Sequence, residues 1–245
     1  MAGTRGGREL PNTPQVRPSR HQVKAAELVT ANEAGALVEQ WYLSNGRHFA
    51  WRDWRDPYRL AVVEILLQRT RASVVERFAV PFFRRFPTWA SIAAASEEEL
   101  QESLLGIGLH VRRAHVLKAL GRHIQAGGDL SQDAPGVGQY VGRAIQVAQT
   151  NASVAMVDGN WVRILHRMFS VGWMADYRYD PRLQQLAQAM VDGAHDSRSL
   201  NWAILDLGAM ICVPRAPRCG QCPIASRCET GNSGGVSLTE ALVRA

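Results

Sequence analysis

The chain has 245 residues, with 28 Lys and Arg against 22 Asp and Glu, which gives a net charge of +6. This length is enough for one large or two small domains with a hydrophobic core, and the positive balance suits a polyanionic partner without establishing one. No apolar run approaches the roughly 20 residues of a membrane span, and the N-terminus lacks the apolar core of a signal peptide. We therefore expect a soluble, cytoplasmic protein rather than a membrane or secreted one.

The N-terminal part divides into a tail and two helices. Residues 1–22 contain Gly, Pro, Ser and Arg with one acidic residue, a composition that predicts a disordered basic tail. Apolar residues then recur at helical spacing over 31–43, where a helix is expected. Asp56-Pro57 opens the next helix, because Pro suits the first helical turn. That helix is mostly apolar, so we expect it near the centre of the fold.

One carboxylate, Glu64, interrupts this apolar helix. A charged group inside an apolar run is costly unless it is paired, hydrogen-bonded or functional. Two interpretations remain open from the residues alone. Glu64 lies either on an exposed polar edge of the helix or in a pocket, where burial would raise its pKa.

The later helices follow from caps and periodicity. Ser96 and Glu99 form a capping box, which predicts a helix start. Further amphipathic or buried helices are expected over 180–190 and 201–211. We find no long-period repeat and no strand-rich section. The predicted fold class is therefore all-α.

A glycine turn lies between two of the predicted helices. Pro135 and Gly136 make a tight turn, and Gly138 allows a close backbone approach because it has no Cβ. A helix is predicted from Gln139, so amide N–H groups would point out of the turn at a helix start. That geometry suits an anion such as phosphate, although an ordinary turn between helices has the same pattern.

A second motif follows about twenty residues later. A short apolar run over 153–157 leads into Asp158, Gly159 and Asn160, and a helix is predicted from Trp161 to about Phe169. Asp is a favoured N-cap residue, so Asp158 has a purely structural interpretation. A functional role for its carboxylate is the alternative.

The four cysteines are confined to the C-terminal part, with gaps of six, two and five residues between them. Their confinement to one short stretch and the expected intracellular location argue against disulfides. A four-cysteine zinc site usually pairs two Cys-x-x-Cys motifs, whereas this chain has one. Four cysteines also suit a 4Fe–4S cluster. The candidate metal ligands are Cys212, Cys219, Cys222 and Cys228.

The order of these motifs resembles the helix–hairpin–helix DNA glycosylases, a family that includes endonuclease III, the adenine glycosylase MutY and the thymine-DNA mismatch glycosylase Mig. The segment from Trp51 to Ala72 is similar to the first motif of MutY and Mig, and the cysteine spacing is the one that the family uses for its 4Fe–4S cluster. The turn here begins with Ala134, where the family usually has Leu. The resemblance covers about residues 31–228.

The resemblance implies a two-lobed, all-α fold with a C-terminal iron–sulfur loop. Its expected parts are a six-helix lobe over about 57–158, a second lobe from 23–56 plus 159–211, the iron–sulfur loop 212–228 and a flexible tail 229–245.

Roles for individual residues also follow from the resemblance. Asp158 is then the catalytic carboxylate, Asn160 orients it, and Glu64 contacts the extruded base. The partner is double-stranded DNA with a mismatched or damaged base, bound by a monomer. The residues expected to contact this DNA are Gly136, Val137 and Gly138 of the turn, Gln68 and Arg69 after the central helix, Leu109 and His110 as the wedge, and Arg215 and Arg218 in the cysteine loop.

Tyr140 bears on the subclass. Endonuclease III carries Lys at this place, whose amine forms a Schiff base that leads to strand cleavage, and a phenol cannot form an imine. We therefore expect a monofunctional base excision repair glycosylase with little or no lyase activity, acting on thymine or uracil opposite guanine. One alternative is a MutY-like adenine glycosylase without the C-terminal domain that recognises 8-oxoguanine. The other is a damage-binding protein that does not cleave, against which the intact Asp158 and Glu64 argue.

Overall fold

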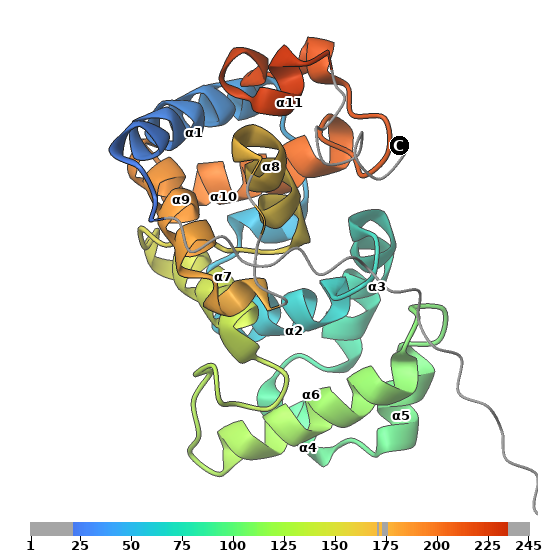
Figure 1. Cartoon of the computed structure of the whole chain (residues 1–245). Coiled ribbons are helices and arrows are strands. Elements are labelled where there is room, and N and C mark those ends of the chain that lie inside the picture. The colour runs from blue at the N-terminus through green and yellow to red at the C-terminus, as the bar shows by residue number, and fades with distance from the viewer. Residues whose placement is uncertain (1–21, 171, 173–175, 235–245) are drawn as a thin grey trace, which may run out of the picture.

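The computed structural model describes residues 22–170, 172 and 176–234, so the predicted basic tail lies almost wholly outside the described residues. The described residues form helices, short 3₁₀ turns and loops without a strand, which confirms the predicted all-α class. No helix among them is both long enough and apolar enough to cross a membrane. Figure 1 shows two lobes, one above the other. The helices are α1 (Ala25–Asn45), α2 (Pro57–Leu67), α3 (Ala72–Arg85), α4 (Trp89–Ala94), α5 (Glu97–Ser103), α6 (His110–Gln125), α7 (Gly138–Thr150), α8 (Gly159–Phe169), α9 (Pro181–Asp192), α10 (Ser197–Met210) and α11 (Glu229–Asn232).

The lower lobe in Figure 1 consists of α2 to α7, with α2 at its centre. Helix α2 packs against α3, α6 and α7, and eight of its eleven residues are buried. Its start follows the predicted chemistry, because the Asp56 side chain accepts a hydrogen bond from the Tyr58 N–H (3.0 Å) and Pro57 is the first helical residue. Glu64 is buried with this helix, at 3 % exposed, which excludes the surface interpretation.

The core of this lobe begins before α2. Phe49, directly before the short 3₁₀ turn at Ala50–Asp53, and Trp51 within it are buried in this core, and their ring centroids lie 4.7 Å apart in a stacked arrangement. The core of the lower lobe therefore begins at Phe49, whereas this lobe was predicted to begin at about residue 57. The predicted capping box is present, with Ser96 and Glu99 each accepting a hydrogen bond from the other's backbone N–H.

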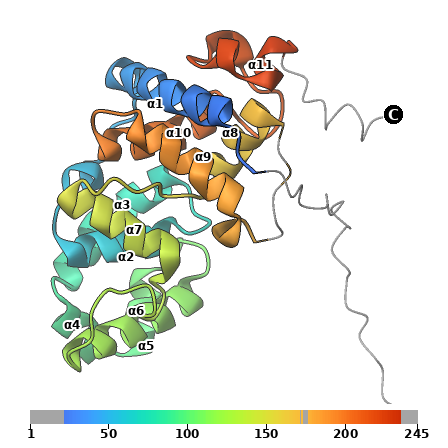
Figure 2. The same ribbon diagram turned by 60° about the vertical axis from the view of Figure 1, so that its left-hand side comes forward.

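The upper lobe consists of α1 and α8 to α11, and Figure 2 shows α1 lying beside α9 and α10. The approach of α1 to α9 is close enough to require glycine. A Cβ on Gly35 would lie 1.9 Å from the Met190 carbonyl oxygen, and one on Gly193 would lie 1.9 Å from the Asn32 carbonyl oxygen. The run before Asp158 also belongs to this lobe, since Ala155 and Val157 are buried in its core.

Residues directly after the last cysteine are ordered, although a flexible tail was expected from 229 onward. Glu229–Asn232 form the short helix α11, which packs against α8, and Thr230 is 2 % exposed. A helix of one turn is not stable by propensity, so contact with α8 holds it in place. The remainder of the predicted tail, from residue 235, lies outside the described residues.

Candidate active site and cysteine centre

Residues of both lobes line a cavity of about 610 Å³. Its volume suits a small organic group such as a nucleobase with part of its sugar. The four residues predicted to be catalytic all face it: Glu64 from α2, Tyr140 from α7, and Asp158 and Asn160 at the start of α8. The other lining residues are Arg47, Phe49, Trp51, Arg52, Leu67, Thr70, Arg71, Ala72, Ser73, Trp202, Leu205 and Ala209.

Asp158 is both a helix cap and a cavity residue, so the two interpretations of this aspartate are compatible. Its Oδ1 accepts hydrogen bonds from the N–H groups of Asn160 (2.9 Å) and Trp161 (3.1 Å), and its Oδ2 accepts one from the Asn160 amide nitrogen (2.7 Å). Burial raises the pKa of Asp158, and these donors lower it, with a net rise. The cap fixes the carboxylate at the cavity wall.

Asn160 is itself held by a residue that the sequence did not single out. The Arg163 guanidinium donates to the Asn160 side-chain oxygen (2.7 Å), to the Gly208 carbonyl (2.8 Å) and to the Cys212 carbonyl (2.7 Å). Gly208 leaves the room this requires, since a Cβ there would lie 2.7 Å from Asn160. Hydrogen bonds therefore run continuously from the first cysteine to Asp158.

Glu64 and Tyr140 provide the titratable groups that face Asp158. Burial raises the pKa of Glu64 to about 7, with Arg52 lowering it and Asp158 raising it further. Near neutral pH this carboxyl therefore exists in both protonation states. Burial and the neighbouring carboxylates hold the pKa of Tyr140 well above its ordinary value, so its phenol stays protonated.

Asp206 on α10 forms an ion-pair network across the two lobes. Its carboxylate is fully buried and accepts a bidentate pair of hydrogen bonds from Arg52 (2.9 and 2.7 Å) and two from Arg47 (2.6 Å to the backbone N–H, 2.8 Å to Nε). Burial opposes ionisation, but the hydrogen bonds and charge of Arg52 and Arg47 hold the pKa of Asp206 below its ordinary value. In the sequence, Arg52 stood out only as part of the segment from Trp51 to Ala72, and its partner Asp206 lies 154 residues further on.

Aromatic side chains surround the same arginine and form one wall of the cavity. The Arg52 guanidinium lies over the rings of Phe49 (5.1 Å) and Trp202 (5.5 Å), both of which line the cavity. Trp51 stacks on Phe49 with an interplanar angle of 7°. A flat apolar wall of this kind suits a planar heterocycle.

A second cavity, of about 280 Å³, gathers several of the predicted DNA contacts. Gln68 and Arg69 of the loop after α2 meet Leu109 before α6 and Gly136 of the glycine turn. Gly136 and Gly138 both have positive φ (77° and 52°), as the turn requires. The remaining lining residues are Ile65, Arg112, Arg113 and Val116.

Val137 was expected to contact DNA together with Gly136 and Gly138, but its environment does not favour this role. Its side chain is 1 % exposed within the lower core, and its N–H donates to the Ala134 carbonyl (3.1 Å), so the amide is already used inside the turn. Gly138 is different, because nothing lies within 4 Å of where its Cβ would be. His110 begins α6 beside Leu109 but does not line the second cavity.

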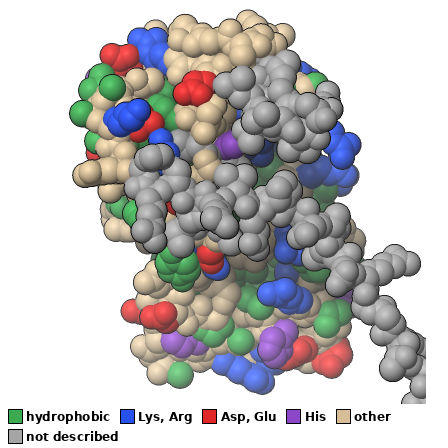
Figure 3. Space-filling model, in the orientation of Figure 1, with side chains coloured by type: hydrophobic (Ala, Val, Ile, Leu, Met, Phe, Trp, Pro, Cys, Tyr) green, Lys and Arg blue, Asp and Glu red, His purple; other side chains and the backbone are tan. Residues whose placement is uncertain are grey.

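Arg215 and Arg218 are exposed on the cysteine loop, away from both cavities. Arg218 donates to the Met210 carbonyl at the end of α10 (3.2 Å). On the face drawn in Figure 3, Lys and Arg side chains are visible on both lobes. Positive charge on both lobes suits a ligand that spans them.

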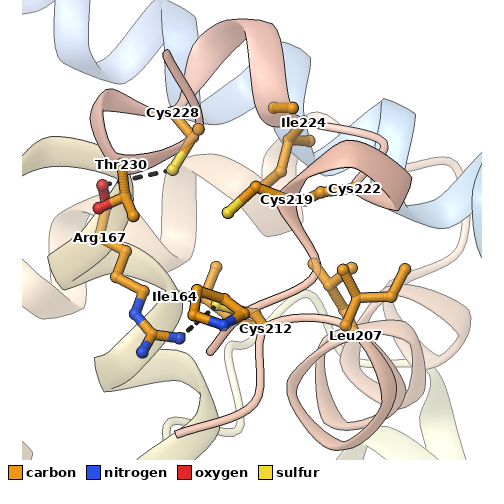
Figure 4. Close-up of a pocket in the computed structure, with 13 residues that line it drawn as sticks. Ile164, Arg167, Leu207, Cys212, Cys219, Cys222, Ile224, Cys228 and Thr230 are labelled. Atoms are coloured by element: carbon orange, nitrogen blue, oxygen red, sulfur yellow. Dashed lines mark hydrogen bonds between the residues drawn. The ribbon is translucent and has the colours of Figure 1, made fainter. Parts of the chain in front are cut away.

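The four cysteines line one cavity beside α8 and α10 (Figure 4). Arg167 of α8 contacts two of them, donating to Cys212 Sγ (3.4 Å) and accepting from Cys228 Sγ at its carbonyl (3.3 Å). The other lining residues are mostly apolar and include Ile164, Leu207 and Ile224. Soft sulfur donors in an apolar shell suit an iron–sulfur cluster.

The arrangement of these thiols also bears on zinc. No group of three His, Cys, Asp or Glu side chains within the described part of the chain is placed to hold a single metal ion. With one Cys-x-x-Cys motif rather than two, the spacing of the cysteines favours a 4Fe–4S cluster over a four-cysteine zinc site. Cys212, Cys219, Cys222 and Cys228 are thus the ligands of a 4Fe–4S cluster, which ties the C-terminal loop to α8 and α10.

Comparison with known proteins agrees with this geometry. The profile of the HhH-GPD superfamily base excision DNA repair proteins matches residues 62–188, and the iron-sulfur binding domain of endonuclease III matches residues 212–228. The thymine/uracil-DNA glycosylase of Methanothermobacter thermautotrophicus is 35 % identical over 202 residues, 79 % of this chain and 90 % of the relative. The human adenine DNA glycosylase is 31 % identical over 227 residues, 86 % of this chain but 41 % of the relative.

Solved structures show the same fold. A thermostable thymine-DNA glycosylase superposes with a TM-score of 0.78 at 30 % identity, covering 85 % of this chain and 99 % of that one. A trapped covalent endonuclease III–DNA intermediate superposes with a TM-score of 0.71 at 16 % identity, covering 87 % and 99 %, a likeness of fold alone. The chain therefore belongs to the HhH-GPD superfamily of base excision DNA repair proteins, as a DNA glycosylase with the 4Fe–4S binding domain of endonuclease III.

Proposed function

We propose that this glycosylase excises thymine or uracil opposite guanine from double-stranded DNA, acting as a monomer. The observation that carries the proposal is the meeting of Asp158, Glu64 and Tyr140 around one interlobe cavity that is large enough to admit a nucleobase with its sugar. The relatives that match over about nine tenths of their own length support the choice of base. They are named thymine/uracil-DNA glycosylase and, at 32 % identity in Aeropyrum pernix, thymine-DNA glycosylase.

The chemistry follows from the two carboxyl groups. A base inside a duplex is inaccessible, so the target nucleotide must first rotate into the cavity. Breaking the N-glycosidic bond then builds positive charge on the sugar, which the Asp158 carboxylate stabilises or captures transiently. The N–H groups of Asn160 and Trp161 favour the ionised form of this carboxylate and oppose the rise in pKa that burial causes. Glu64, with a pKa of about 7, supplies a proton or hydrogen bond to the departing base.

Strand cleavage is not part of the proposed activity. A Schiff-base lyase needs an amine next to the sugar, and Tyr140 offers a phenol that remains protonated. The chain has two lysines, and neither lines the cavity. Lys24 caps the start of α1, and Lys118 is buried in the lower lobe, where it donates to the Ala95 carbonyl.

DNA contacts are assigned to the side of the second cavity. Gly136 and Gly138 bind a phosphate through the turn, while Gln68, Arg69, Leu109 and His110 enter the space that the rotated nucleotide leaves. The exposed Arg215 and Arg218 add phosphate contacts from the cysteine loop. The cluster, when bound, holds that loop in shape and takes no part in breaking the glycosidic bond.

Adenine excision is the second candidate, because the human adenine DNA glycosylase is also 31 % identical to this chain. Single-turnover assays on G·T, G·U and 8-oxoguanine·A duplexes, each with and without alkali, separate the candidates. We expect product from G·T and G·U only after alkali, since the enzyme leaves an abasic site intact. Release of adenine alone would overturn the choice of base, and no release from any duplex would leave only damage binding.

A further inference from the structure

Two loops on the side of the second cavity contain residues with unfavourable backbone conformations. Arg69, after α2, and Leu109, before α6, both have φ of 59°, in the left-handed region that non-glycine residues rarely adopt. Such a conformation costs on the order of 1 kcal/mol or more per residue and persists only where the surroundings impose it. Both residues line the same cavity, so whatever imposes the conformation fixes the position of both side chains.

Arg113 of α6 contacts both loops at once. Its guanidinium donates to the Gln68 carbonyl and to the Thr70 hydroxyl (2.6 Å), which are the neighbours of Arg69 on either side. It also donates to the carbonyls of Ile107 (3.3 Å) and Gly108, directly before Leu109. One side chain therefore joins the two loops through four hydrogen bonds placed next to the two strained residues.

The environment of Arg113 is unusual for a buried cation. The side chain is 4 % exposed, and its hydrogen-bond acceptors are three carbonyls and a hydroxyl, all neutral. Burial accordingly lowers the pKa of the guanidinium. Burying a charge without an opposite charge is costly. If the side chain served stability alone, neutral groups would connect the two loops at a lower desolvation cost. The planar fork of five donors is what lets a single residue reach both loops.

We propose that Arg113 is a positioning residue that locks the loops of Arg69 and Leu109 into one rigid wedge, which holds the target nucleotide out of the duplex. The proposal rests on the proposed glycosylase function and adds the reason why two separate loops act together. A wedge of this kind matters when the base must leave a paired, stacked position. It matters little when the base has no partner and is already displaced.

The test compares one target base in two pairing states. Single-turnover excision is measured for Arg113→Ala and Arg113→Lys on thymine opposite guanine and on thymine opposite an abasic site. We expect Arg113→Ala to slow excision from the G·T pair by on the order of tenfold or more, and excision opposite the abasic site by less than about threefold. Arg113→Lys should fall between wild type and Arg113→Ala, because one ammonium cannot reach both loops.

Arg112→Ala is the matched control, since Arg112 is an exposed arginine beside Arg113 that lines the same cavity. Loss of a phosphate contact there should slow both substrates to the same degree, and the slowing relative to wild type should shrink as the salt concentration rises. Equal slowing of both substrates by Arg113→Ala or by Arg113→Lys would overturn the lock. If Arg113→Ala does not fold, the test is made with Arg113→Lys, by comparing its slowing on thymine opposite guanine with its slowing on thymine opposite the abasic site. A wrong choice of base shows instead as no release of thymine by the wild type, and the comparison is then made with the base that it does release.

Discussion

Asp158 and Asp206 are the same residue type near the same cavity, yet their environments shift the pKa of the carboxyl group in opposite directions. The pKa of Asp158 is raised, and its hydrogen-bond donors are two backbone N–H groups and the neutral amide of Asn160. The pKa of Asp206 is lowered, and its donors include the guanidinium groups of Arg52 and Arg47. The difference lies in the charge of the donors.

This contrast separates a structural carboxylate from a catalytic one. Two arginines neutralise Asp206, so it has little interaction left for a ligand and instead joins the lobes. Asp158 is oriented by neutral donors, and the charge of nearby Arg163 compensates its negative charge only weakly. A cation developing on a bound sugar therefore gains more from Asp158 than from Asp206.

The largest expected effect is on excision by Asp158→Asn. We expect the single-turnover rate to fall by about 10³-fold or more, because the charge that stabilises the sugar cation is removed. The fold should remain, since Asn is also a good N-cap residue. Thermal unfolding and binding to an uncleaved mismatch duplex are the controls. A variant that keeps a tenth of the wild-type rate would contradict the assignment of Asp158.

Asp206→Asn should show the opposite profile, with its main effect on stability. Removing this carboxylate leaves Arg52 buried without its counter-charge, which costs about 3–5 kcal/mol in comparable networks. Urea unfolding monitored by circular dichroism measures the change, with Asp158→Asn as the matched variant. If the two variants unfold at the same urea concentration, the distinction between the two aspartates fails.

Glu64→Gln tests the third carboxyl through its pH dependence. The protonated fraction of Glu64 falls as the pH rises through about 7, so wild-type excision should decline over this range. Glu64→Gln should lower the rate at pH 6 by about 10²-fold and remove the decline, because Gln cannot transfer a proton. A wild-type rate that rises steadily from pH 6 to pH 8 would exclude Glu64 as the proton donor.

Glu64 also makes the free energy of unfolding depend on pH. The folded-state pKa of Glu64 lies above its ordinary value of 4.5, so the folded protein binds more protons between pH 4.5 and about 7. Its contribution to the free energy of unfolding is complete below pH 4.5 and declines as the pH rises to about 7. The unfolding free energy of Glu64→Gln should lack this decline when both proteins are titrated with urea across that range.

The smallest expected effect is that of Arg163→Met, which acts on Asp158 through Asn160. Loss of the hydrogen bond to Asn160 loosens the carboxylate without removing it, so we expect roughly tenfold slower excision. Arg163 donates to the Cys212 carbonyl, and Arg167, which donates to the Cys212 sulfur, is retained, so the bound iron and sulfide should stay at the wild-type level. A loss of iron that parallels the loss of activity would assign Arg163 to the cysteine centre instead.

Local patterns in the sequence predicted much of this molecule. The starts of α2 and α5 follow from Asp56-Pro57 and from the Ser96 capping box, because caps act within one turn. The spacing of the four cysteines predicts that they bind one common centre. Roles of Asp206, Arg163 and Arg113 were not predicted, since each depends on partners in another part of the chain.

The sequence by itself indicated seven of the eleven helices in the described residues, the glycine turn, the cysteine ligands and the capping geometry of Asp158, because each depends on residues a few positions apart. Only the tertiary structure decided that Glu64 is buried opposite Asp158, that Asp206 is neutralised by two arginines, and that Val137 is buried in the lower core. Burial, pKa and hydrogen-bond partners depend on which distant elements pack against a residue, and that packing is set by the two cores as a whole.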